Sequence, residues 1–88
     1  MNELLRFSAK GTNGVNAFLP PKYEFVFYDT KLVMIRKGKT ERIIEYSDIT
    51  EVTLIKTWQN NMFINCKPIG INIYKVDDAT YQKIKDIK

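Results

Sequence analysis

The chain has no histidine, a single cysteine and no long hydrophobic run. Without histidine it lacks the commonest general base and metal ligand of proteins. Cys66 alone cannot form a disulfide within the chain. The apolar runs are only a few residues long, far short of the ~20 that a membrane-spanning helix needs. These absences exclude a disulfide scaffold and a zinc finger, argue against an enzyme, and predict a cytoplasmic protein without a cofactor or metal.

What is present is an ordinary globular composition in a short chain. The 88 residues are 44% hydrophobic and 27% charged, which is enough for one core and too little for two. We therefore expect a single domain over 1–88. It divides into an N-terminal strand and long loop (1–22), a run of antiparallel strands (23–75) and a C-terminal helix (77–88).

The middle of the chain repeats with the period of a strand. In 23–28, Tyr23, Phe25 and Phe27 share one face, as inward residues of a half-buried strand do. Glycine, asparagine and proline separate further segments rich in β-branched residues. A long loop is expected from Gly11 to Pro21. The expected strands are 4–9, 23–28, 31–37, 40–46, 49–57, 62–66 and 69–74.

The last residues change to a helical pattern. Asp77 or Asp78 is a suitable N-cap, because its carboxylate can accept a hydrogen bond from a free backbone N–H. The apolar residues that follow at helical spacing are Ala79, Tyr81, Ile84 and Ile87. A helix this short is marginal alone, so it is expected to dock on the sheet.

Seven short strands followed by one amphipathic helix suit two orthogonal antiparallel sheets with a helix in the open corner. At residues 23–35 and 43–52 the chain resembles the pleckstrin-homology-like (PH-like) superfold, and in particular the small bacterial PH and GRAM-like domains. The first segment is similar to that family's hairpin, and the second to its segment leading into the fifth strand, with Glu45 where a proline is usual. The resemblance implies a mainly β, PH-like split barrel of about seven strands.

The residues offer little for catalysis. Cys66 has no histidine to activate it and is expected to be a buried or half-buried thiol. The resemblance raises phosphoinositide binding, but Glu24 stands where the family's basic pattern, starting from Lys10 and Lys22, needs an arginine. We therefore expect no specific phosphoinositide site and no small-molecule substrate.

Basic residues are concentrated in the first half of the chain. Residues 1–44 hold eight basic and four acidic side chains, whereas 45–88 hold six of each. The excess is densest in a predicted hairpin, where a basic patch would face nucleic acid, an anionic membrane or an acidic protein, or would simply keep the hairpin solvated. Its members are Lys31, Arg36, Lys37, Lys39 and Arg42.

Trp58 lies beside a polar turn, Gln59-Asn60-Asn61. One interpretation is that it folds back to cap the sheet. The other is that it anchors a partner, with Met62 and Phe63 alongside, because tryptophan is enriched in binding hot spots.

These features predict a non-catalytic interaction module that binds a protein, or itself, through sheet edges and the Trp58 turn. The alternative is an electrostatic binder of nucleic acid or anionic membrane that uses the basic hairpin 31–42. Salt separates the two, because contacts between surface charges weaken steeply as ionic strength rises.

Overall fold

The computed structural model describes residues 2–13 and 19–87. Within them the chain forms seven strands, one short 3-10 turn and one α-helix. The strands are β1 (Glu3–Asn13), β2 (Lys22–Tyr28), β3 (Lys31–Arg36), β4 (Lys39–Glu45), β5 (Ile49–Lys56), β6 (Asn60–Cys66) and β7 (Ile71–Tyr74). The 3-10 turn η1 (Tyr46–Asp48) joins β4 to β5, and α1 (Asp78–Ile87) follows β7. The protein is mainly β with one C-terminal helix, as the alternating pattern of the strands and the helical spacing of the last residues predict.

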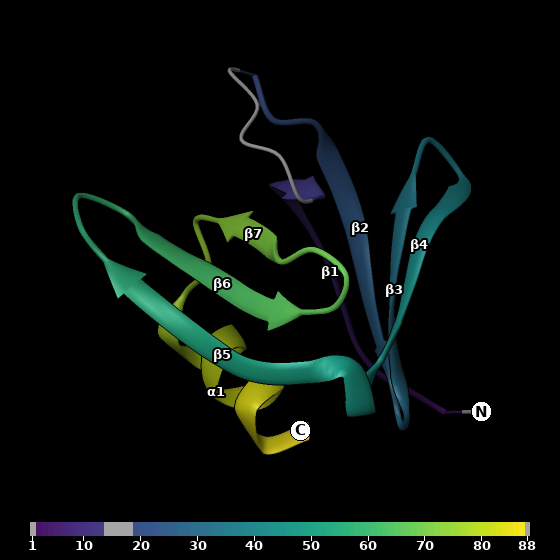
Figure 1. The fold of residues 1–88 in the computed structure, drawn as a ribbon. Helices are drawn as coiled ribbons and strands as arrows, with labels where there is room; N and C mark the ends of the chain where they lie inside the picture. Colours follow the sequence, from purple (N-terminus) through teal and green to yellow (C-terminus); the bar gives the residue numbers. More distant parts are fainter. Residues whose placement is uncertain (1, 14–18, 88) are drawn as a thin grey trace.

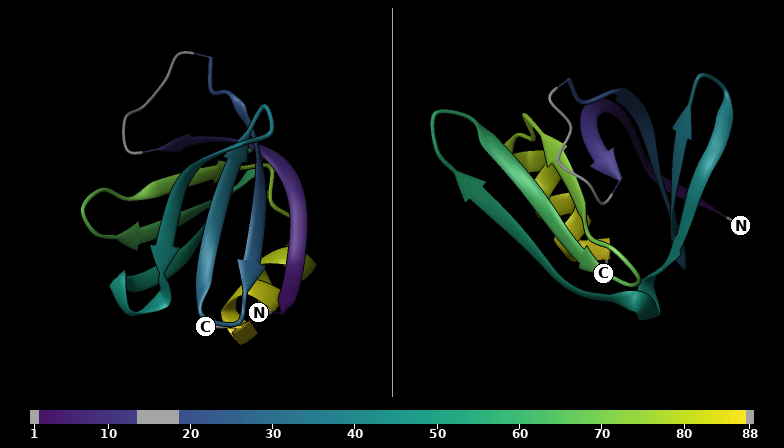
Figure 2. Two further views of the ribbon diagram at one scale, coloured as in Figure 1. Left: turned by 90° about the vertical axis from the view of Figure 1, so that its right-hand side faces the viewer. Right: turned by 45° about the horizontal axis from the view of Figure 1, so that its top comes forward.

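The seven strands form one antiparallel sheet in the order β4-β3-β2-β1-β7-β6-β5. We call β1 to β4 the first arm, and β5 to β7 with the last residues of β1 the second arm. Figure 1 shows the two arms opening upward like the sides of a V, and Figure 2 shows the same arrangement from two other directions. Because β4 and β5 are the two ends of the order, the described sheet is open and is not closed into a barrel.

Strand β1 joins the two arms and is longer than the sequence suggests. The predicted loop begins at Gly11, but residues 11–13 are still strand and pair with residues 71–73 of β7. Glycine and asparagine are poor strand formers, which is why the pattern indicated a loop there. Of the rest of that loop, residues 14–18 lie outside the described residues and Leu19 is exposed.

Gly11 is required where β1 crosses from one arm to the other. A Cβ atom at this position would lie 2.6 Å from the backbone oxygen of Asn72 and 3.1 Å from Cζ of Phe25. The first contact is with backbone, which cannot move aside as the end of a flexible side chain can. The absence of a side chain therefore allows β1, β7 and the ring of Phe25 to approach one another.

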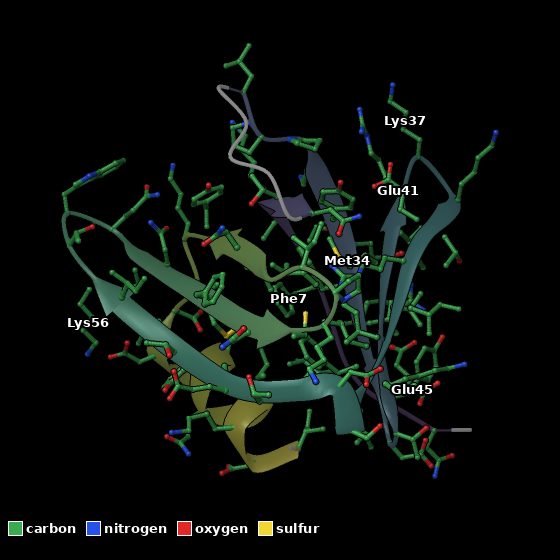
Figure 3. The ribbon with its side chains drawn as sticks, in the orientation of Figure 1. Phe7, Met34, Lys37, Glu41, Glu45 and Lys56 are labelled. Atoms are coloured by element: carbon green, nitrogen blue, oxygen red, sulfur yellow. The ribbon has the colours of Figure 1, made fainter. Side chains whose placement is uncertain are left out.

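The core lies between the arms and against the helix. Phe25, Phe27, Leu32 and Met34 of the first arm are buried, as the alternation predicts. Figure 3 places Phe7 and Met34 on the side of the first arm that faces the second. From the second arm come the buried residues Val52, Met62, Ile64, Ile71 and Ile73.

The helix closes one side of this core. Ile84 is buried, and Ile84 and Ile87 border the same small interior space as Phe27 and Ile64, which come from the two arms. Ala79, the first residue of the predicted apolar stripe, is exposed. The helix is therefore held mainly by its second half. Among the described residues, no helix is both long and apolar enough to cross a membrane.

Further positions depart from the alternation. Ile69 is exposed and lies before β7, which begins at Ile71 rather than at Ile69. Val26 points to the outer face of the first arm yet is fully buried, because it lies between Arg6 of β1 and Val33 of β3 in the ladders. A central strand with a neighbour on each side can thus bury apolar residues on both faces.

We predict that Gly11→Ala lowers the free energy of unfolding by about 1–3 kcal/mol, because the added methyl group overpacks the crossing point. Urea denaturation measures the loss. Gly38→Asn is the matched control, since Gly38 has φ +77° and open space around it, and asparagine tolerates that conformation. An unchanged unfolding free energy for Gly11→Ala would contradict the tight crossing.

The start of α1 predicts a pH dependence. Asp77 Oδ1 accepts a hydrogen bond of 2.7 Å from the backbone N–H of Thr80. Hydrogen bonds from Thr80 lower the pKa of Asp77 below its ordinary value of 3.8. A lowered pKa in the folded state means that this stabilisation is present above the ordinary pKa and is lost as pH falls through the folded one.

Asp77→Asn keeps a capping oxygen but removes the titration. We expect the variant to lose less stability than the parent when thermal unfolding is compared below and above pH 3.8. Parallel pH profiles of the two proteins would show that the cap does not titrate as described.

Candidate functional site

Trp58 stands at the tip of the turn between β5 and β6. The turn is closed by Thr57, whose backbone N–H and side-chain hydroxyl both donate to the backbone oxygen of Gln59, each at 3.2 Å. The ladder reaches the base of the turn through Lys56 and Asn60, so the tip projects beyond the sheet. Trp58 is 87% exposed. The sequence left two interpretations of this residue open. In the structure Trp58 is exposed, and its indole does not fold back onto the sheet.

The two residues predicted to accompany Trp58 lie elsewhere. Met62 is fully buried in the core opposite Ile73, so it supports β6 from within and offers no surface to a partner. Phe63 is half-buried on the other face of β6, where its ring lies against Gly70. Successive residues of a strand point to opposite faces, which separates Met62 from Phe63. Trp58, Met62 and Phe63 therefore do not form one surface.

A cleft of about 640 Å³ lies beside Trp58 instead. This volume falls in the range of ligand-binding pockets. The residues around the cleft come from β1, from the start of β2 and the segment before it, from the β5–β6 turn, and from the end of β7 and the residue after it. They are Ser8, Ala9, Lys10, Pro20, Lys22, Trp58, Gln59, Tyr74 and Lys75.

The cleft exists because β1 and β7 separate. Their ladder ends at the pair Gly11 and Ile73. If it continued in the same register, Lys10 would face Tyr74 and Ala9 would face Lys75. These four residues line the cleft instead. The cleft therefore begins at the point where β1 leaves the second arm.

The charge around the cleft has one sign. Lys10, Lys22 and Lys75 are exposed, and no acidic side chain is among its described lining residues. A second, smaller hollow shares Trp58, Gln59 and Lys75 with the first, but the acidic residue Asp77 also lines it. The first cleft is therefore the one whose surroundings favour an anion.

The predicted basic patch is divided by the structure. Lys37 and Lys39 are exposed at the β3–β4 turn, where Figure 3 shows Lys37 pointing away from the sheet. Positive φ values at Lys37 (53°) and Gly38 (77°) are those of the tight hairpin turn that matches the twist of two strands. Arg36 lies 3.5 Å from the carboxylate of Glu41, and the ammonium of Lys31 lies 6.0 Å from the ring centre of Tyr28.

Arg42, the fifth member, reaches across to the second arm. Its Nη1 donates to Oδ1 of Asn13 at 2.9 Å, and its Nη2 donates to the backbone oxygen of Lys67 at 3.1 Å. The same Nη2 lies 3.6 Å from the sulfur of Cys66. Arg42 therefore connects β4 to the end of β1 and to the β6–β7 turn, and it is not part of an exposed cluster with Lys37 and Lys39.

Cys66 is buried, as expected from the sequence. Burial raises the pKa of its thiol, and the nearby Arg42 lowers it by a smaller amount. The protonated thiol is thus favoured, which is the unreactive form. Among the residues that the structure describes, no three metal-ligating side chains are grouped together.

Sequence reasoning did not associate Lys10, Lys22, Tyr74 and Lys75 with Trp58. They come from strands far apart in the chain, and only the pairing of β1 with β7 brings them together. The local signal was the turn itself, with a tryptophan among polar residues. Neither the protein-family models nor the curated protein sequences contain a match to this chain.

The exposure of Trp58 and the burial of Met62 predict opposite effects on stability. Trp58→Ala should change the free energy of unfolding by less than about 0.5 kcal/mol, as exposed substitutions usually do. Met62→Ala should lower it by about 2–5 kcal/mol, because it leaves a cavity in the core. Urea denaturation followed by circular dichroism distinguishes the two. A large loss for Trp58→Ala would mean that the indole packs on the sheet.

Proposed function

We propose that this protein is a non-catalytic interaction module that binds a partner protein through the surface around Trp58. The observation that carries the proposal is the 87% exposure of the tryptophan at the tip of a well-closed turn. Exposed large aromatic side chains beside a hollow are typical of binding surfaces, because their burial on association contributes strongly to affinity.

The cleft supports the same proposal. Trp58 forms one of its walls, and Tyr74 contributes a second aromatic ring. Tyrosine and tryptophan combine a large apolar area with few rotatable bonds, so they bind partners at a low cost in conformational entropy. A partner side chain in the cleft would contact both rings.

The fold belongs to the proposal as well. We regard the domain as PH-like, with the first and second arms as the two sheets of a split barrel and α1 at its open corner. The antiparallel strand order and the terminal helix support this assignment. Such a scaffold presents hairpin turns from a rigid sheet, which suits binding better than catalysis.

Sheet edges provide the second means of association that the sequence suggested. β4 and β5 are the outer strands of the described sheet, and an outer strand can pair with an extended segment of another chain. Self-association along one of these edges is compatible with binding at Trp58, since Trp58 lies beyond the end of β5.

A second candidate is electrostatic binding of nucleic acid or an anionic membrane through the basic hairpin. The exposed pair Lys37 and Lys39 favours it. However, Arg36 is paired with Glu41, and Arg42 is hydrogen-bonded to the second arm. That surface therefore has less free positive charge than its number of basic residues implies.

Affinity capture of the tagged protein from native lysate tests the proposal. We expect a protein partner that survives nuclease and a wash at physiological salt, and that is lost with Trp58→Ala. Ile69→Ala is the matched control, because Ile69 is an exposed apolar residue between β6 and β7, on neither outer strand and outside the residues that line the cleft. Material lost with nuclease, with salt or with Lys37→Glu/Lys39→Glu, and kept by Trp58→Ala, would favour the basic hairpin instead.

A further inference from the structure

The side of β1 that faces the cleft is an open strand edge. The backbone N–H of Gly11 donates to the oxygen of Pro21 at 3.0 Å, on the side of β2. In an antiparallel ladder, alternate residues direct their N–H and C=O groups to opposite sides. Ser8 and Lys10 therefore direct these groups away from β2, toward the side of β7.

On that side the described pairing stops before it reaches them. The ladder between β1 and β7 contains only residues 11–13 of β1. Ser8 and Lys10 lie past its end, at the wall of the cleft. Neither residue has a pairing partner on that side in the described part of the chain. Extended backbone from another molecule is the natural complement of such an edge.

We propose that the cleft between β1 and β7 binds a short, extended, acidic segment of a partner protein, which adds to the edge of β1 at Ser8 and Lys10. This inference rests on the proposed function and names the chemistry of its partner. The bound segment contributes backbone hydrogen bonds to β1, an apolar side chain to the hollow and carboxylates to its rim.

The acidic character follows from the lysines. Lys10, Lys22 and Lys75 surround the cleft without an acidic neighbour among its described lining residues. The arginines, by contrast, are engaged within the protein: Arg6 by Glu3 and Glu24, and the others as described above. The charge available to a ligand at this site is therefore that of lysine ammonium groups, which bind carboxylates as point charges.

The apolar side chain follows from the aromatic walls. Trp58 and Tyr74 come from the β5–β6 turn and from the end of β7, and Ala9 is the residue of β1 between the two edge positions. In a strand added to β1, alternate side chains point to the same face. A leucine or an aromatic residue in the bound segment would therefore contact Trp58 and Tyr74. Acidic residues on either side of it would lie near the lysines at the rim.

The backbone edge favours a peptide over single-stranded nucleic acid. An aromatic platform beside lysines could also stack a base and pair with phosphates. A sugar–phosphate backbone, however, offers no regular series of donors and acceptors to an open strand edge, whereas an extended peptide does. A nucleic acid is therefore an outcome of the test rather than part of the proposal.

Trp58 is the only tryptophan of the chain, so its fluorescence reports on the cleft directly. The probe is a synthetic peptide of about ten residues in which leucine alternates with glutamate. We expect its addition to the full chain to shift the tryptophan emission to shorter wavelength. The same peptide with lysine for glutamate, and an oligothymidine of equal charge, should leave the emission unchanged.

Two sets of variants assign the effect. Lys10→Glu/Lys75→Glu should weaken peptide binding by at least about tenfold, since it reverses the charge at the rim. Lys37→Glu/Lys39→Glu makes the same change in net charge on the β3–β4 turn and should have little effect. Amide hydrogen exchange should slow at Ser8 and Lys10 when the peptide binds, and a peptide N-methylated at alternate positions should bind weakly.

An emission shift with oligothymidine and none with the acidic peptide would overturn the proposal in favour of a nucleic-acid platform. No response to either probe, or peptide binding without slower exchange at Ser8 and Lys10, would also overturn it. The experiments test the proposed function and the acidic ligand independently of each other. A captured protein that depends on Trp58 but is not displaced by the acidic peptide would keep the interaction module and remove its acidic ligand.

Discussion

The structure depends on one strand serving two ladders. β1 pairs with β2 along most of its length and with β7 over its last three residues, and Gly11 lies where the two pairings meet. A side chain there would collide with the backbone of Asn72. This close approach joins the two arms at one place, and the core and α1 fill the space between them.

The cleft is the other result of that arrangement. Two strands that diverge from a common ladder leave a widening gap, and the β5–β6 turn extends past the sheet to border it. The charges are distributed accordingly. Arg42 holds β4 to the second arm through Asn13 and Lys67, so it contributes to the fold, whereas the lysines around the gap remain available to a ligand.

The local parts of the fold were predictable. Alternation located β2 to β6 to within a few residues, since Phe25 and Phe27 must face a core, and Asp77 marked the start of α1. The extension of β1 was not, because residues 11–13 are strand only through their partners in β7. The candidate site was also predictable only in part. The turn that carries Trp58 could be recognised in the sequence, whereas Tyr74 and Lys75 are brought to it only by long-range strand pairing.

The same pairing orders the events of folding. Thr12 and Asn72, which are hydrogen-bonded to each other, are 60 residues apart in the chain. The hairpins from β2 to β4 are formed by residues close together in the chain and can form early. In contrast, β1 can pair with the second arm only after β7 has formed. During synthesis the far end of β1 therefore remains an unsatisfied edge until nearly all of the described chain has left the ribosome. In that interval the nascent domain is most exposed to pairing with other chains.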